Sequence, residues 1–358
     1  MTESSTKGTP NLPELPTEVH RQIVENVGMP SYPSQYLIPQ TQRQDLGSLC
    51  LASNFFHSIA TEVLHARVHI TPRNISSFVQ RVKDSVAGPP KVKFLAFVGF
   101  AFVLPEWEQE FIITILQGLP SETVTHILFD MPLRSIYRVP SPNDNPESSV
   151  LRMTHALNQF VNVKEFISVR DEAHLLGWMT GPVLWPHWPQ IQRVALYNPE
   201  ILEEAFIEAI VQSKSLRLMC CLNPRLAGGI ETDEDFAELI DQAAPELSFL
   251  FLDAENMGDE ETDGDYFPIA KEELYSEPLL HYAIEEPDRV TLVDVEEITD
   301  ELDKRSPTSR PTDWFFNLAV SGRLWEIGRF AISTATAKRY LQLEGEVVEE
   351  VEDANELT

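Results

Sequence analysis

The sequence predicts an α/β protein, in which an N-terminal helical module precedes a curved solenoid of alternating strands and helices. Two observations lead to this fold class. Short apolar, strand-like segments recur between residues 92 and 293, and helical candidates lie between most of them. Upstream, two patterns with helical spacing occupy residues 12–70. Strands that alternate with helices are expected to be parallel, because each helix returns the chain to the start of the next strand.

The helical module is expected to begin at residues 15–18, Leu-Pro-Thr-Glu. Proline is tolerated there because the N–H that it lacks would have no intrahelical partner. Val19, Ile23 and Val27 then recur with helical spacing and predict one apolar stripe. A second helix is expected after Asp45, whose carboxylate can accept hydrogen bonds from the first-turn N–H groups. Its stripe would consist of Leu46, Leu49, Cys50, Ser53, Phe56 and Ile59, and residues 63–70 would lead out of the module.

This ordered series resembles the F-box in its fungal form. Two departures are visible: residues 28–44 are longer than the usual connection, and Phe56 stands near a position where many members carry tryptophan. The matching residues are Leu15, Pro16, Glu18, Val19, Ile23, Asp45, Leu46, Leu49, Cys50, Ser53, Phe56, Ile59, Ala60, Val63 and Leu64.

The resemblance implies an adaptor that docks on the Skp subunit of a Skp–cullin–F-box ubiquitin ligase. Without the resemblance, the same side chains are simply the core of a small helical bundle, because any two amphipathic helices give similar stripes. The residues that the resemblance assigns to Skp binding are Leu15, Pro16, Ile23, Leu46, Leu49 and Phe56.

The solenoid is predicted from strand-like segments that return at an irregular period of roughly 25 to 40 residues. Each unit would bury its apolar face on its neighbours. Helices are expected within residues 76–86, 108–116, 151–160, 201–211 and 235–242. The strand segments are residues 92–98, 124–129, 163–169, 191–196, 216–220, 247–252 and 290–293.

This body resembles the degenerate leucine-rich-repeat region that follows the F-box in many fungal proteins. The consensus asparagine of such repeats is mostly missing, although Asn198 and Asn223 stand directly after two strand segments. The alternative is a compact α/β domain, on which an enzyme would still need a recognisable site. The resulting domain prediction is a disordered tail (1–10), the F-box module (11–70), the repeat body (71–302), a linker (303–312), C-terminal capping helices (313–343) and an acidic tail (344–358).

Composition excludes several classes of function. The chain carries 27 basic and 56 acidic residues and a formal charge of -29, which argues against nucleic-acid and anionic-membrane surfaces. Its three cysteines form no disulfide framework, so a reducing compartment, the cytoplasm or the nucleus, is expected. The start of the chain has no apolar stretch of a secretory signal, and no apolar run is long enough to span a membrane.

No catalytic or cofactor-binding pattern is present. The sequence lacks a nucleophile elbow, a Walker loop, a dinucleotide-binding glycine motif and a zincin helix. Residues 259–265 are acidic, but Ala270 stands where a calcium loop needs a bidentate glutamate, so they are interpreted as a solvated loop. The prediction is a non-enzymatic protein without cofactor or metal.

Two aromatic clusters remain. Trp178, Trp185 and Trp188 fall in a Pro- and Gly-rich stretch, where they either pack into the core or form a pocket for a target protein. Residues 313–330 are expected to close the last open end of the solenoid. Acidic residues gather in 231–303 and 344–358, either as a solvated face or as a surface that favours basic partners.

Together these patterns predict the substrate-recognition adaptor of a Skp–cullin–F-box ligase. The N-terminal helices would bind a Skp-family protein and, through it, a cullin, and the body would bind a protein target. The alternatives are a Skp-binding scaffold without ligase activity, and an enzyme whose site the sequence does not reveal.

Overall fold

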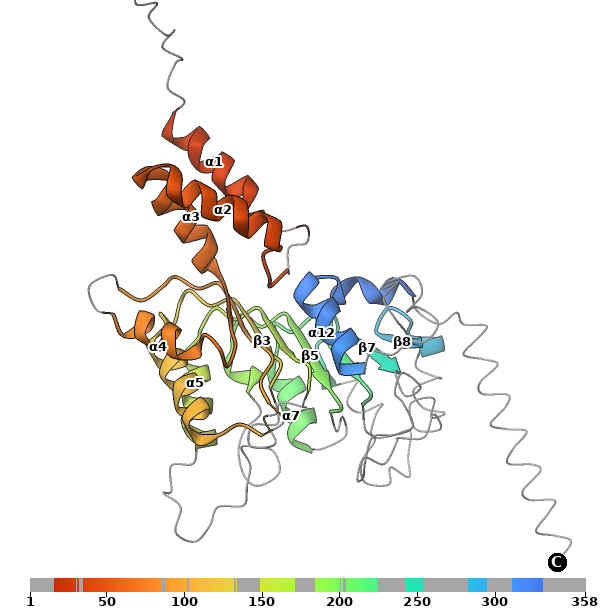
Figure 1. Ribbon diagram of the computed structural model, residues 1–358. Helices are drawn as coiled ribbons and strands as arrows, with labels where there is room; N and C mark the ends of the chain where they lie inside the picture. The colour runs from red at the N-terminus through yellow and green to blue at the C-terminus, as the bar shows by residue number, and fades with distance from the viewer. Residues whose placement is uncertain are drawn as a thin grey trace, which may run out of the picture. The chain divides into compact units, whose positions relative to one another are not determined.

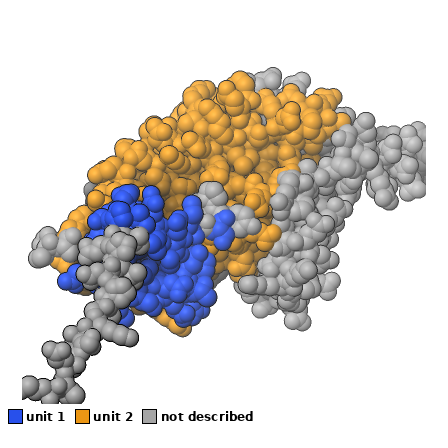
Figure 2. All heavy atoms as spheres, turned by 90° about the horizontal axis from the view of Figure 1, so that it is seen from above, with its two compact units in different colours: residues 1–31, 38–65 blue, residues 32–37, 66–358 orange. Residues whose placement is uncertain are grey.

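The computed structural model divides into two compact units. Unit 1 comprises residues 1–31 and 38–65, and unit 2 comprises residues 32–37 and 66–358 (Figure 2). The structure describes residues 16–29, 31, 35–84, 88–101, 103–131, 133, 149–170, 184–199, 201, 204–224, 242–253, 283–294 and 311–330.

Unit 1 is built from three helices, α1 (Thr17–Val27), α2 (Gln40–Ala52) and α3 (Asn54–Ala66). The first helix begins where the sequence predicts, since the Pro16 carbonyl accepts the N–H groups of Val19 and His20 at 3.0 and 3.2 Å. The apolar core of the unit contains the buried residues Val24, Ile38, Leu46, Ile59 and Ala60, with Val27, Leu49, Cys50, Phe56, Val63 and Leu64 partly buried against them.

The second predicted helix is in fact two helices. The prediction that it starts after Asp45 is wrong, because α2 begins at Gln40 behind Pro39 and Asp45 lies exposed within it. Ser53 is extended (φ −164°, ψ 162°) and separates α2 from α3. Its hydroxyl accepts the N–H of Phe56 at 3.2 Å, as an N-cap serine does. The apolar stripe continues across this break because both helices pack on the same core.

Unit 2 contains an eight-stranded sheet in which every paired strand is parallel and the order follows the chain, from β1 to β8 (Figure 1). All the predicted strand segments form strands, and the segment that was expected only to lead out of the module forms an additional one, β1. The strands are β1 (Arg67–Ile70), β2 (Phe94–Phe97), β3 (His126–Phe129), β4 (Glu165–Ser168), β5 (Arg193–Tyr197), β6 (Leu218–Leu222), β7 (Ser248–Asp253) and β8 (Val290–Asp294).

Three strands end in the same backbone conformation. Gly99, Asn198 and Asn223 have positive φ angles of 72°, 55° and 47°, and the strand register puts them at equivalent positions. Glycine and asparagine are the residues that tolerate this left-handed region. The N–H groups of Asn198 and Asn223 donate to the carbonyls of Leu222 and Leu252 at 2.7 and 2.9 Å. The two asparagines singled out in the sequence therefore repeat one structural role.

Helices cover the first face of the sheet. They are α4 (Ile75–Lys83), α5 (Glu106–Gly118), α6 (Ser149–Asn158) and α7 (Glu204–Gln212), joined by the short 3-10 helix η2 (Trp185–His187). Four of the predicted helices are thus confirmed, whereas most of the fifth, 235–242, lies outside the described residues. Their side chains form one continuous core with alternate strand residues such as Leu95, Phe129 and Phe166.

The second face of the sheet is covered by the segment around Tyr36 and by α12 (Pro311–Ser321) and the 3-10 helix η4 (Leu324–Phe330). The Tyr36 N–H donates to the carbonyl of Val320 at 3.1 Å, and its hydroxyl donates to the carbonyl of Ile127 at 3.2 Å. Trp314 and Leu324 are buried in one cluster with side chains from β2 to β8.

Two sequence-based expectations change with this arrangement. Residues 313–330 were predicted to close the end of the solenoid, but they lie across a face of the sheet, because their apolar side chains match the second strand face and not only the last strand. The structure also explains the unusual length of the connection formed by residues 28–44. Its middle, residues 32–37, belongs to unit 2 and supplies Tyr36 to the sheet.

A row of polar and aromatic side chains lies under Tyr36 at the first positions of neighbouring strands. Arg67, Phe94, His126, Glu165 and Arg193 follow one another in register. The Arg67 guanidinium lies 4.0 Å from the centre of the Phe94 ring, which stacks on His126 at 4.0 Å. Glu165 is fully buried and pairs with Arg193 at 2.7 Å. The ion pair offsets part of the cost of burying this carboxylate.

This row predicts a dependence of stability on pH. Burial, and to a smaller extent the charges of Arg193, Arg67 and Lys164, together lower the pKa of His126 from 6.5 to about 3. At a pH below the ordinary pKa of histidine, the unfolded chain binds a proton at His126 and the folded chain does not. His126 therefore lowers the free energy of unfolding as the pH falls from 6.5 towards 3. In urea unfolding at about pH 7 and about pH 5, His126→Phe is expected to lose less stability on acidification than the wild type. The same loss in both proteins would contradict the assignment.

Candidate interaction surfaces

Unit 1 exposes large apolar side chains. Ile23 is 44% exposed, Leu51 90% and Phe55 39%, and Met29 at the end of α1 is 63% exposed. These are half of the large exposed apolar residues in the described part of the chain, although unit 1 is by far the smaller unit. Exposed apolar side chains mark a protein-binding site where they form a contiguous patch.

An aromatic cluster connects part of this surface. His20 on α1 contacts the rings of Phe55 and Phe56 on α3 edge-to-face, at 5.8 and 5.4 Å between centroids. Ile23 lies one helical turn after His20 and therefore on the same side of α1. Leu51 and Phe55 stand on either side of the Ser53 break. We refer to Ile23, Leu51 and Phe55 as the apolar surface of unit 1.

The residues assigned to Skp binding by resemblance fall into different places. Leu15 lies outside the described residues, and Pro16 and Ile23 are exposed. Leu49 and Phe56 are partly buried against the core of unit 1. Leu46 is 0% exposed, so its side chain holds the three helices together and offers no surface to a partner, contrary to the prediction. The reason is that Leu46 lies in the core that it forms with Val24 of α1 and with Ile59 and Ala60 of α3.

The tryptophans considered for target binding are core residues where the structure describes them. Trp185 is 0% and Trp188 1% exposed. The Trp188 indole N–H donates to the carbonyl of Leu157 at 3.2 Å, and Trp185 meets Phe206 edge-to-face at 5.6 Å. Core packing, the first of the two interpretations, is therefore correct for these two, and Trp178 lies outside the described residues.

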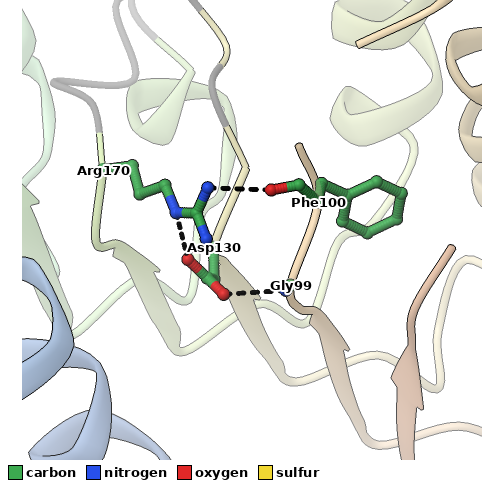
Figure 3. A network of polar contacts seen from close by, with 4 residues as sticks. All are labelled: Gly99, Phe100, Asp130 and Arg170. Atoms are coloured by element: carbon green, nitrogen blue, oxygen red, sulfur yellow. Dashed lines mark hydrogen bonds and ion pairs between the residues drawn. The ribbon is translucent and has the colours of Figure 1, made fainter. Parts of the chain in front are cut away.

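A polar network joins three successive strand ends (Figure 3). Asp130 follows β3, and its carboxylate accepts the N–H of Gly99, after β2, at 2.8 Å. Arg170, after β4, donates from Nε to Asp130 at 2.5 Å and from Nη1 to the carbonyl of Phe100 at 2.8 Å. The network fixes where the chain leaves the carboxyl edge of the sheet, the edge at which open α/β sheets commonly bind ligands.

Asp130 is 7% exposed. Burial raises its pKa, and the charge of Asp313 acts in the same direction, while the Gly99 N–H and Arg170 oppose the shift. A carboxylate held this way orients Arg170 and the loop after β2. Sequence reasoning missed the network because its members come from three separate loops and share no local motif.

The described residues contain no group of three histidine, cysteine, aspartate or glutamate side chains placed to hold a metal ion. Within the same residues no helix has the length and apolarity needed to cross a bilayer. Comparisons with protein-family models, with curated proteins and with solved structures found no match. Any assignment of function therefore rests on the surfaces described above.

The Asp130–Arg170 pair is predicted to be energetically coupled. Asp130→Ala and Arg170→Ala should each destabilise unit 2 by about 1–3 kcal/mol, because each leaves a partly buried polar partner unsatisfied. The double variant should lose about 1–2 kcal/mol less than the sum of the two. Urea unfolding of the four proteins measures this coupling.

The ion pair between Arg217 and Glu246 is the matched control. Its side chains are 48% and 69% exposed at a separation of 3.7 Å, so the same cycle should give a coupling of about 0.5 kcal/mol or less. Equal coupling in both cycles would show that the network at the sheet edge has no special structural role.

Proposed function

We propose that the protein is the substrate-recognition adaptor of a Skp–cullin–F-box ubiquitin ligase. Unit 1 binds a Skp-family protein, and unit 2 binds the protein target. The observation that carries the proposal is the exposed apolar surface of unit 1, Ile23, Leu51 and Phe55, on helices whose sequence follows the order of the F-box.

The size of this surface supports a stable complex. Burying a large apolar side chain contributes roughly 1.5–3 kcal/mol. Three such side chains, together with Leu15 from the motif, would offset a substantial part of the free-energy cost of association. Leu46 and Val24 contribute indirectly, since they form the core that sets the positions of the three helices.

For unit 2 we propose a degenerate solenoid of the leucine-rich-repeat kind. Three features support this. The strands follow chain order, helices α4 to α7 cover one face, and Asn198 and Asn223 have the same left-handed backbone conformation directly after their strands. In one respect the unit differs from an open repeat array. Tyr36, α12 and η4 bury the second strand face, so the target is expected to bind elsewhere on unit 2.

The proposed mechanism is proximity and involves no catalytic residue or cofactor of this chain. Holding a target beside a separate conjugating enzyme raises the effective concentration of its lysines there. Cys50, Cys220 and Cys221 are free thiols, which is compatible with a cytoplasmic or nuclear protein. A Skp-binding scaffold would share the first step and lack the cullin.

The Skp interface predicts the effect of a double variant. Ile23→Ala with Leu51→Ala should reduce capture of a purified Skp-family protein by at least about tenfold, because it removes apolar area that the partner would bury. Gln22→Ala is the matched control, since Gln22 is an exposed polar residue of the same helix. Pull-down with purified proteins measures the capture, and thermal melting shows that the variants stay folded.

Undiminished capture by the double variant would exclude this surface as the Skp site. Affinity purification from cells distinguishes a ligase adaptor from a Skp-binding scaffold. A ligase adaptor brings down a cullin together with Skp, whereas a scaffold brings down Skp without it.

A further inference from the structure

Unit 2 has an exposed aromatic surface at the start of α5. Trp107 is 51% exposed, and Val103, shortly before the helix, is 53% exposed. Leu151 on α6 is 37% exposed. We refer to Val103, Trp107, Phe111 and Leu151 as the Trp107 surface.

Side-chain contacts link Trp107 to Phe111 and helix α5 to helix α6. The indole of Trp107 meets the Phe111 ring edge-to-face at 5.7 Å between centroids. Arg152 on α6 makes two hydrogen bonds to Glu110 on α5, one of them 2.8 Å from Nη2 to Oε2, and so joins the two helices beside Leu151. The surface contains a shallow, open hollow that is lined by Glu106, Trp107, Glu110 and Phe111.

The rest of the described body offers little comparable surface. Over the second strand face, Tyr36 and Trp314 are at most 2% exposed, and Trp325 is partly buried against the same cluster. Trp185 and Trp188 are buried on the first face. Beyond the Trp107 surface, the remaining large exposed apolar side chain among the described residues of unit 2 is Val161, after α6. Among the described residues, Trp107 is thus the one tryptophan with an exposed side chain, and tryptophan is enriched among residues that dominate binding energies.

The charges around this surface favour a cation. Glu106 is exposed and adjacent to Trp107, whereas Glu110 is already paired with Arg152. The whole chain carries a formal charge of -29, which attracts positively charged partners over longer distances. The face of a tryptophan ring also binds guanidinium and ammonium groups.

From these observations we propose that the Trp107 surface binds a basic segment of a partner protein. An arginine or lysine side chain lies over the Trp107 indole with its charge against Glu106, and a neighbouring apolar side chain occupies the hollow beside Phe111. The proposal shares no residue with the Skp site and does not rest on the assignment of unit 1. In an adaptor, this surface is where the target binds.

The network at the sheet edge holds the start of the loop that leads to α5. Arg170 holds the carbonyl of Phe100, and Asp130 holds the N–H of Gly99, at the start of the loop that leads through Val103 to α5. Arg170 and Asp130 are thus positioning residues for the loop.

The test uses the full-length protein and a fluorescein-labelled peptide that alternates arginine and leucine, with fluorescence anisotropy as the readout. A peptide with glutamine in place of arginine keeps the apolar part and removes the charge. The arginine peptide should bind more tightly, and Trp107→Ala should weaken its binding by about tenfold. Glu106→Lys should weaken it as well and reduce its dependence on salt. Val161→Ala, which removes an exposed apolar side chain elsewhere on unit 2, should bind as the wild type does.

Two results would overturn the proposal. If Trp107→Ala and Glu106→Lys bind the arginine peptide with wild-type affinity, the attraction is a general effect of net charge. If the wild type does not distinguish the arginine peptide from the glutamine peptide, the surface does not select a basic partner. Circular dichroism of each variant shows whether it is folded. Because Glu106→Lys alters only an exposed side chain, its peptide affinity tests the proposal even if Trp107→Ala does not fold.

Discussion

A parallel sheet has to be covered on both faces, and the structure of unit 2 follows from this constraint. Helices α4 to α7 cover one face, and their apolar side chains fill one continuous core. The other face is covered by two pieces that lie far apart in the chain, the segment around Tyr36 and the pair α12 and η4. A hydrogen bond from the Tyr36 N–H to Val320 joins these two pieces. Binding of a partner is therefore expected on the helices and loops.

The strands and most helices could be predicted from the sequence because local apolar patterns determine them. Contacts between distant segments left no comparable pattern. Tyr36 lies in a stretch that looks like a long linker, and only the three-dimensional structure brings it to β2 and β3. The Ser53 break was also hidden, since apolar spacing runs through it. Of the candidate site residues, the motif identified Ile23 as exposed surface, whereas Leu46 is core. Leu51 and Phe55 carried no signal beyond their apolar character.

The two units expose apolar side chains of different kinds. Unit 1 presents mainly aliphatic and phenylalanine side chains around Ile23, which suit a complementary apolar helix surface. Unit 2 presents a tryptophan beside an exposed glutamate, which suits a cation. A protein with two surfaces of distinct chemistry can hold two partners without competition between them, and this is the physical requirement for any adaptor, whatever its partners are.

The interruption of unit 1 by residues 32–37 has a consequence for dissecting the molecule. No single cut separates the two units, because a fragment ending at residue 65 carries Tyr36 away from Phe94 and His126. The remainder would then expose aromatic rings at the first strands and leave the amide partner of Val320 missing. An N-terminally shortened protein would thus be prone to aggregate for reasons unrelated to the loss of the three helices. Point substitutions on the surface are the sounder way to assign a role to either unit.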